Sequence, residues 1–416
     1  MTHDTDSGTR RLSRRHFLSA SAVVTATLAG CLDGDGDDDG DDGEATQPDA
    51  VENGVPQFPR VEDPPQAVYK PTHRESMVML PTVEAGEYEL LPHFTYPHEF
   101  WLVTGTERES VTPTDPGIHL MFAFWDAETG EILPVDAGAE IEIRKDGERV
   151  TSPISPWPML AQGMGFHFGD NVPLREDGTY EVEVTLNPIN ARKTGEFDGR
   201  FEETQTATFQ FEYSLDLIQE VTESIEYLDE EEWGERGALD STVHVDPPGH
   251  ADDMNDGHGD NGDAHGDGGH NGHGDDHDGH SDDHDGHHGP AMSLPPAEEY
   301  PGTDLGTHSS GDAAFVVRYF EQSRLADGSG YLLVSPRTPY NRYPLPDMSL
   351  SLQGDYERDL TQTLDSELGH HYGTQVDLSA GDSLELVVNS PPQIARHRGY
   401  ETAFIEMESM TFEVPE

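Results

Sequence analysis

Hydrophobic and polar positions alternate in short runs between about residues 68 and 213, and clusters of Gly, Pro and Asp separate the runs. Val, Ile, Phe and Tyr recur on a period of two, which is typical of strands with one buried face. These runs occupy residues 88–91, 99–103, 118–125, 139–144, 180–186 and 207–213. Short strands at this spacing predict an antiparallel β-sandwich.

The pattern then changes to a helical period and back again. Apolar residues recur at steps of three and four from Leu215 to Leu228, which predicts an amphipathic helix over 215–232. A second block of apolar runs follows at 314–320, 331–334, 383–388, 403–406 and 410–414. The fold class expected is therefore all-β, with two antiparallel sandwiches joined by a short helix and a linker.

The two blocks share a short motif that indicates an internal duplication. Residues 165–169 read G-F-H-F-G, and residues 369–373 read G-H-H-Y-G. In both blocks a turn glycine and a strand follow, and a proline lies ten residues past that glycine. We interpret the second block as a diverged copy of the first.

The N-terminus carries the pattern of an exported lipoprotein. Arg14 and Arg15 stand in S-R-R-x-F-L, which matches a twin-arginine signal. An apolar run too short to span a bilayer comfortably leads to L-A-G-C, which resembles a lipobox ending at Cys31. We expect Cys31 to be lipidated and to tether the protein to the extracellular face of the membrane; the alternative is a structural cysteine after a chance apolar run.

Charge and cysteine content exclude several classes of protein. The chain has 83 Asp and Glu against 23 Lys and Arg, a net charge of −60, so it repels nucleic acid. A single Cys excludes an internal disulfide, an iron–sulfur cluster and a zinc ribbon. The acidic balance is typical of a haloarchaeal-type protein that works in high salt, and a cationic partner is the alternative.

A tract of Asp, Gly and His separates the two blocks. Ten histidines lie in it: His250, His258, His265, His270, His273, His277, His280, His284, His287 and His288. Flexible glycines, carboxylate oxygens and imidazole nitrogens can enclose divalent ions in many similar ways. The tract therefore predicts weak, multiple sites for zinc, nickel or copper that act as a sink or as a feeder for a tighter site; the alternative is a solvated acidic linker.

The residues around the first motif resemble the periplasmic high-affinity iron-transport family, immunoglobulin-like proteins that bind copper and iron beside an iron permease. In that family a Met precedes the His-Tyr-Gly segment by about seven residues, and here Met159 precedes His167 by eight. The family's His-Leu-Glu is similar to His119-Leu120-Met121, with Met121 in place of the Glu. The resemblance implies a metal site of these residues, and we expect Met159, Met164 and His167 on the loop and turn that lead into the next strand.

The resemblance also implies a fourth ligand that the first block lacks. The family has a further His in a Gly-Arg-His segment, which is absent from 190–201 but is matched by His397 in the second block. His371 there matches His167, yet the earlier strand at 331–334 has no His. Because the two sets are complementary, we predict that the sandwiches pack as a pseudo-dimer, with the first block's His119, Met159 and His167 facing His397.

The chemistry of these residues suits transition metals, although a structural role is open. Imidazole suits copper, zinc and iron, and a thioether at Met121 in place of a carboxylate favours Cu(I) over ferrous iron. On residue chemistry alone, Met121, Met159 and Met164 are equally typical of core packing, and His119 of a hydrogen-bonded buried histidine.

These features together predict a division of the chain into six parts. They are a signal at 1–31, an acidic linker at 32–64, an immunoglobulin-like metal-binding domain at 65–214, a helix and connector at 215–243, the His-rich tract at 244–293 and a second immunoglobulin-like domain at 294–416.

No enzyme motif occurs, since the chain has no P-loop, G-x-S-x-G or H-E-x-x-H. We expect an exported, lipid-anchored protein that captures iron or copper for a membrane transporter, with a permease as its partner. A surface module for adhesion or envelope structure is the alternative. A cupredoxin-like electron carrier is disfavoured because such sites use a Cys thiolate, and the sole Cys lies in the signal.

Overall fold

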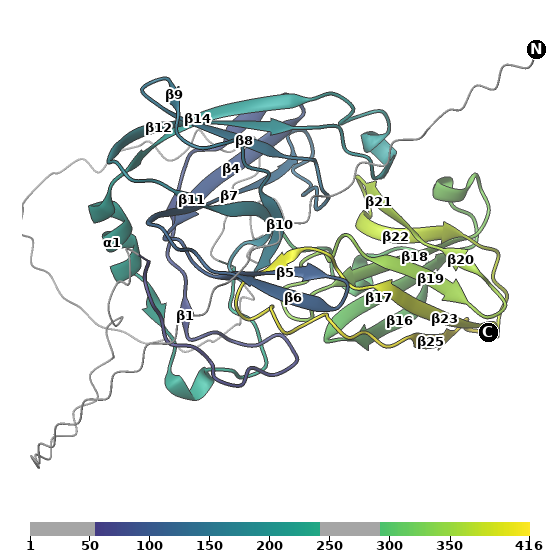
Figure 1. Ribbon diagram of the computed structural model, residues 1–416. Helices are drawn as coiled ribbons and strands as arrows, with labels where there is room; N and C mark the ends of the chain where they lie inside the picture. The colour runs from purple at the N-terminus through teal and green to yellow at the C-terminus, as the bar shows by residue number, and fades with distance from the viewer. Residues whose placement is uncertain (1–54, 242–291) are drawn as a thin grey trace, which may run out of the picture. The chain divides into compact units, whose positions relative to one another are not determined.

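The computed structural model describes residues 55–241 and 292–416, which are almost entirely β-structure (Figure 1). Cys31, the arginine pair and the ten histidines of the tract lie outside the described residues, so the predictions for them stay predictions. Within the described ranges, no helix has both the length and the apolar character needed to cross a membrane.

The first block forms one large sheet and one small sheet. Along the large sheet the strands are β2 (Val78–Met79), β4 (Tyr88–Thr95), β7 (Gly117–Asp126), β11 (Gly165–Pro173), β10 (Trp157–Ala161), β24 (Ala395–Arg396), β5 (Phe100–Thr104) and β6 (Glu107–Val111), with β3 (Val83–Ala85) on β4. Along the small sheet they are β14 (Gln205–Tyr213), β12 (Gly178–Leu186), β8 (Glu140–Lys145) and β9 (Glu148–Arg149).

The two faces of β7 have different roles. Strand β12 alternates buried apolar and exposed polar residues, as a strand covered on one face should, but every residue of β7 is buried. Leu120 and Phe122 belong to the main core together with the residues of the small sheet, whereas Met121 belongs to a separate cluster. The large sheet is therefore covered on both sides, and His119 and Met121 lie on the face away from the main core.

The second block forms two further sheets. The six-stranded sheet contains β13 (Arg192–Thr194), β21 (Thr361–Asp365), β22 (Gly369–Gln375), β18 (Tyr331–Arg337), β17 (Ala313–Phe320) and β16 (Thr303–Ser310). The four-stranded sheet contains β20 (Arg358–Asp359), β19 (Ser349–Gln353), β23 (Ser383–Ser390) and β25 (Met410–Glu413). The all-β fold class predicted from the sequence is confirmed.

Each block contributes a short strand to the other. Strand β24 of the second block lies parallel to β10 of the first, and β13 of the first block lies parallel to β21 of the second. The exchange is reciprocal, because β10 and β21 each precede the strand that carries the Gly-x-His motif. The described residues of both blocks accordingly belong to one compact unit.

Two predicted elements are wrong in extent or type. Helix α1 spans Leu215–Glu223, not 215–232, and Ser224 ends it. A longer helix would place the acidic residues that follow at its C-terminus, which is the negative end of the helix dipole. The chain leaves the helix instead, and β15 (Glu226–Tyr227) pairs with β1 (His73–Arg74). Residues 403–406 form a turn rather than a strand, with Phe404 in a left-handed conformation at φ 58°.

The remaining elements are short 3₁₀ turns. They are η1 (Gly195–Phe197), η2 (Glu230–Glu232), η3 (Ala297–Glu299) and η4 (Arg324–Ala326).

Candidate metal centre

Three neighbouring strands present the predicted ligands of the first block on one face. We expected Met159 and His167 on a loop and a turn, but they lie in β10 and β11, where they pair directly across a hairpin. In the adjacent strand β7, His119 and Met121 stand two residues apart and therefore point to the same side. Both histidines and Met159 have no exposed surface.

The second block supplies His397 to this face. Strand β24 runs along β10, and the His397 backbone N–H then donates to the carbonyl oxygen of Leu160 at 3.0 Å. The His397 ring centroid lies 5.1 Å from that of His167 and 5.3 Å from that of His119. The predicted juxtaposition of these side chains is therefore present in the structure.

His98 joins the group, although no pattern in the sequence predicted it. Its ring centroid lies 4.2 Å from that of His119, and its Nε2 lies 3.1 Å from Nδ1 of His397. One ligand atom from each of these three histidines lies within 4.8 Å of the others. His98 follows β4 in a short loop, where no periodic pattern or motif marks it.

Hydrogen bonds fix the tautomer of the imidazole rings. Nδ1 of His98 donates to the carbonyl of Tyr96, and Nδ1 of His167 to the carbonyl of Gly165, both at 3.1 Å. Nδ1 of His119 faces Oδ1 of Asn171 at 3.1 Å. Because these oxygens only accept, the proton lies on Nδ1 and the lone pair on Nε2, the arrangement that metal-bound histidines use.

Three of the four Nε2 atoms have no protein partner. Nε2 of His119, His167 and His397 is buried and lacks a hydrogen bond among the described residues. A buried polar nitrogen without a partner costs about 1–3 kcal/mol, and a metal ion would remove that cost. The donor set therefore fits a metal ion.

Burial also keeps the rings neutral. Desolvation lowers the pKa of His98 to about 4 and moves the pKa values of His119 and His167 well below their ordinary value. The neighbouring imidazoles add to this effect, since two positive rings would repel each other. At neutral pH each of these three rings can give its lone pair to a metal without first losing a proton.

Gly169 leaves the space into which these donors point. A Cβ at this position would lie 3.0 Å from Sδ of Met159 and 3.1 Å from both Nε2 of His119 and Cγ of Met121. The thioether and the imidazole thus converge on one small volume that a side chain would fill. Met121 packs beside this volume in its own apolar cluster.

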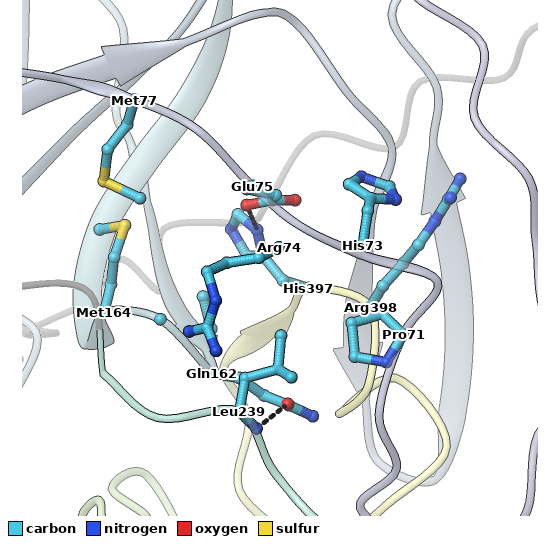
Figure 2. Close-up of a pocket in the computed structure, with 12 residues that line it drawn as sticks. Pro71, His73, Arg74, Glu75, Met77, Gln162, Met164, Leu239, His397 and Arg398 are labelled. Carbon is cyan, nitrogen blue, oxygen red and sulfur yellow. Dashed lines mark hydrogen bonds and ion pairs between the residues drawn. The ribbon is translucent and has the colours of Figure 1, made fainter. Parts of the chain in front are cut away.

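A carboxylate approaches the group from another segment. The Glu75 oxygens lie 3.8 Å from Nε2 of His98 and 3.8 Å from Nδ1 of His397, and Figure 2 shows Glu75 directly beside His397. The resemblance implied that Met121 had replaced the family's carboxylate. The structure supplies a carboxylate from outside the motif, which the sequence analysis also missed.

Besides Met121, which packs in its own apolar cluster, two predicted ligands lie outside the group. His371 is satisfied by protein, because its Nδ1 donates to the carbonyl of Gly369 at 3.0 Å and its Nε2 faces the Tyr331 hydroxyl at 3.2 Å. Met164 lies at the hairpin turn with Sδ 3.1 Å from Nε2 of His93. The structure therefore brings together His119, Met159, His167 and His397 from the predicted set and adds His98 and Glu75.

Comparisons with known proteins give a partial likeness. Residues 298–413 match a family model described as a domain of unknown function (DUF7350), and no curated protein matches the chain. Two solved structures of FetP from a uropathogenic Escherichia coli strain are similar to part of it. The protein as isolated has 19% identity and a TM-score of 0.26, and a copper-bound variant has 17% identity and a TM-score of 0.25. Both cover 33% of this chain, and 95% and 92% of the respective FetP chains.

Proposed function

We propose that the chain is a metal-binding protein that captures copper or iron outside the cell for a membrane transporter. The observation that carries the proposal is the convergence of buried, unpaired Nε2 lone pairs from His119, His167 and His397. Met159 and His98 complete the set. The group binds and releases an ion, and no enzymatic step is assigned to it.

The donor types favour copper over ferrous iron. Imidazole is a neutral donor that suits copper, and a thioether is a soft neutral donor that favours Cu(I), whereas iron without sulfide prefers more oxygen ligands. Glu75 supplies a carboxylate only at the edge of the group. We therefore expect copper to bind more tightly than ferrous iron at this centre.

Export, lipid anchoring at Cys31 and delivery to a permease are the part of the proposal that depends on the N-terminal sequence pattern. A tethered protein with a buried, protein-enclosed ion would hold the metal close to its transporter. The His-rich tract at 250–288 would raise the local concentration of metal before it enters the tighter centre.

We further propose that the second block is a copy whose own centre has been lost. In the strand pairing, Thr363 takes the place of Met159 beside the motif histidine His371, and Tyr331 faces Gln375 as His119 faces Asn171. The Tyr331 hydroxyl supplies the proton that Nε2 of His371 accepts. The first block thus keeps unpaired Nε2 lone pairs, whereas in the second block the Nε2 lone pair of His371 accepts a hydrogen bond.

Metal titration of three forms of the protein tests the function. The unmutated protein should hold a copper ion against excess free imidazole, and the double variant His119→Ala/His167→Ala should lose one tightly held equivalent. His371→Ala is the matched control, a buried histidine outside the centre, and should keep it. If the unmutated protein holds no copper under these conditions, the alternative of a structural or adhesion module stands instead.

A further inference from the structure

A second set of soft donors lies beside the proposed centre. His93 of strand β4 is directly paired with Met121 of β7, so its side chain lies on the same face of the sheet as the metal centre. Both His93 and Met164 are buried, and Nε2 of His93 lies 3.1 Å from Sδ of Met164. The proposed function uses neither residue.

The two atoms in contact, Nε2 of His93 and Sδ of Met164, both carry lone pairs and no hydrogen. Nδ1 of His93 donates to the carbonyl oxygen of Leu91 at 3.1 Å, so in the neutral ring Nε2 has no hydrogen. A thioether sulfur can only accept. Two acceptors therefore face each other, and no proton is present to form a hydrogen bond between them. Their distance suits two ligands of one metal ion.

Met77 adds a third donor. It packs against the cluster that contains Met164, Met121 and Trp125, and Figure 2 shows the Met77 and Met164 sulfurs pointing toward each other. Met77 is partly exposed, whereas Met164 is buried. The donors thus extend from the protein surface inward to His93.

A pocket connects these donors with the first centre. Met77 and Met164 line one side of it, and Glu75 and His397 line the other (Figure 2). An ion held by the two sulfurs is therefore in the same pocket as a ligand of the proposed centre.

We propose that Nε2 of His93 and the sulfurs of Met164 and Met77 form a second metal site, which binds a soft monovalent cation, Cu(I), at the entrance to the first. One imidazole and two thioethers are neutral and soft, a set that suits Cu(I) and offers little to iron or to hard divalent ions. The binding of an ion at this second site does not depend on the proposed function. Only the role of the second site as an entrance to the first centre rests on that function.

The experiment counts tightly held ions, with Ag(I) as a redox-inert probe of Cu(I). The full chain is titrated in excess free imidazole, and bound ions are counted by native mass spectrometry. Unmutated protein should hold two ions, and Met77→Leu/Met164→Leu should hold one, because leucine keeps the volume and removes the sulfur. The control Met348→Leu/Met410→Leu, two buried methionines of the second block, should hold two.

The variants of the first centre separate this proposal from the proposed function. His119→Ala/His167→Ala should keep the ion bound by sulfur, and X-ray absorption of that form loaded with Cu(I) should show sulfur neighbours of the metal. If the Met77/Met164 variant still holds two ions, or if both double variants lose one and the same ion, the second site does not exist. Met164→Leu alone gives the same count should the double variant fail to fold.

Discussion

At the scale of single residues, the absent side chain of Gly169 decides whether the metal centre can be occupied. Gly169 does not have a left-handed backbone, so alanine is compatible with its conformation. The added methyl group would meet Sδ of Met159 and Nε2 of His119 at about 3 Å. It would therefore fill the volume that the ion requires and leave the strand pairing intact.

We predict that Gly169→Ala lowers copper affinity at least ~10-fold, equivalent to about 1.4 kcal/mol, and destabilises the protein by about 1–3 kcal/mol through overpacking. Copper competition and thermal unfolding measure the two effects. Gly105→Ala is the control, because Gly105 has open space around it but φ is +61°. That variant should lose stability and keep its copper, and a copper loss in both variants would mean that the affinity only follows stability.

The sequence predicted the ligands that lie in motifs and missed those that do not. Met159 and His167 were predicted because their spacing resembles that of the iron-transport family, and His397 because it matches that family's Gly-Arg-His segment, which the first block lacks. His98 and Glu75 stand in short connections, where only the tertiary fold brings them to the centre. His371 follows the pattern and still is not part of the group, because a hydroxyl from the neighbouring strand occupies its lone pair.

At the scale of elements, the two exchanged strands make the blocks depend on each other. Strand β24 fills the position between β10 and β5, and Arg396 within it is fully buried. Without this strand, β10 and β5 would each have an unpaired edge. The metal centre depends on the same strand, because His397 follows it directly.

We predict that a single cut between residues 242 and 291 leaves the two halves bound to each other and the metal centre complete. A protease site inserted there allows the cut in the folded protein, and size-exclusion chromatography with copper analysis gives the result. One peak that contains both fragments and retains copper is expected. Fragments that separate without denaturant would show that the strand exchange contributes little to the association.

The local sequence pattern predicts some strands of this fold and does not predict others. Strands with a clean period of two, such as β12 and β14, occur close to where the sequence predicts them. The exchanged strands have two and three residues and pair with partners far along the chain, so no local window contains their signal. The helix was predicted too long because the apolar spacing continues to Ile225 and Leu228, past Ser224, where the helix ends.

At the scale of the whole molecule, many buried histidines make folding depend on pH. Desolvation, the largest cause in each case, lowers the pKa of His73, His93, His98 and His371 to about 4 and that of His370 to about 3. In the unfolded chain a histidine titrates near ~6.5. Between these values the unfolded state binds more protons than the folded state, so stability falls as the pH falls.

We predict that the metal-free protein is at its full histidine-linked stability above about pH 6.5 and loses it progressively toward pH 4. Each such histidine contributes a slope of up to ~1.4 kcal/mol per pH unit within that window. Unfolding followed by circular dichroism at fixed ionic strength, over pH 7.5 to 4, measures the loss. His370→Leu should reduce the slope, because it removes a buried imidazole whose two nitrogens lack partners among the described residues.

Copper should move the loss of stability to lower pH, since an ion bound to Nε2 excludes the proton from the same lone pair. A stability that does not change between pH 7 and 4.5 would contradict the neutral, buried state of these rings on which the metal centre depends.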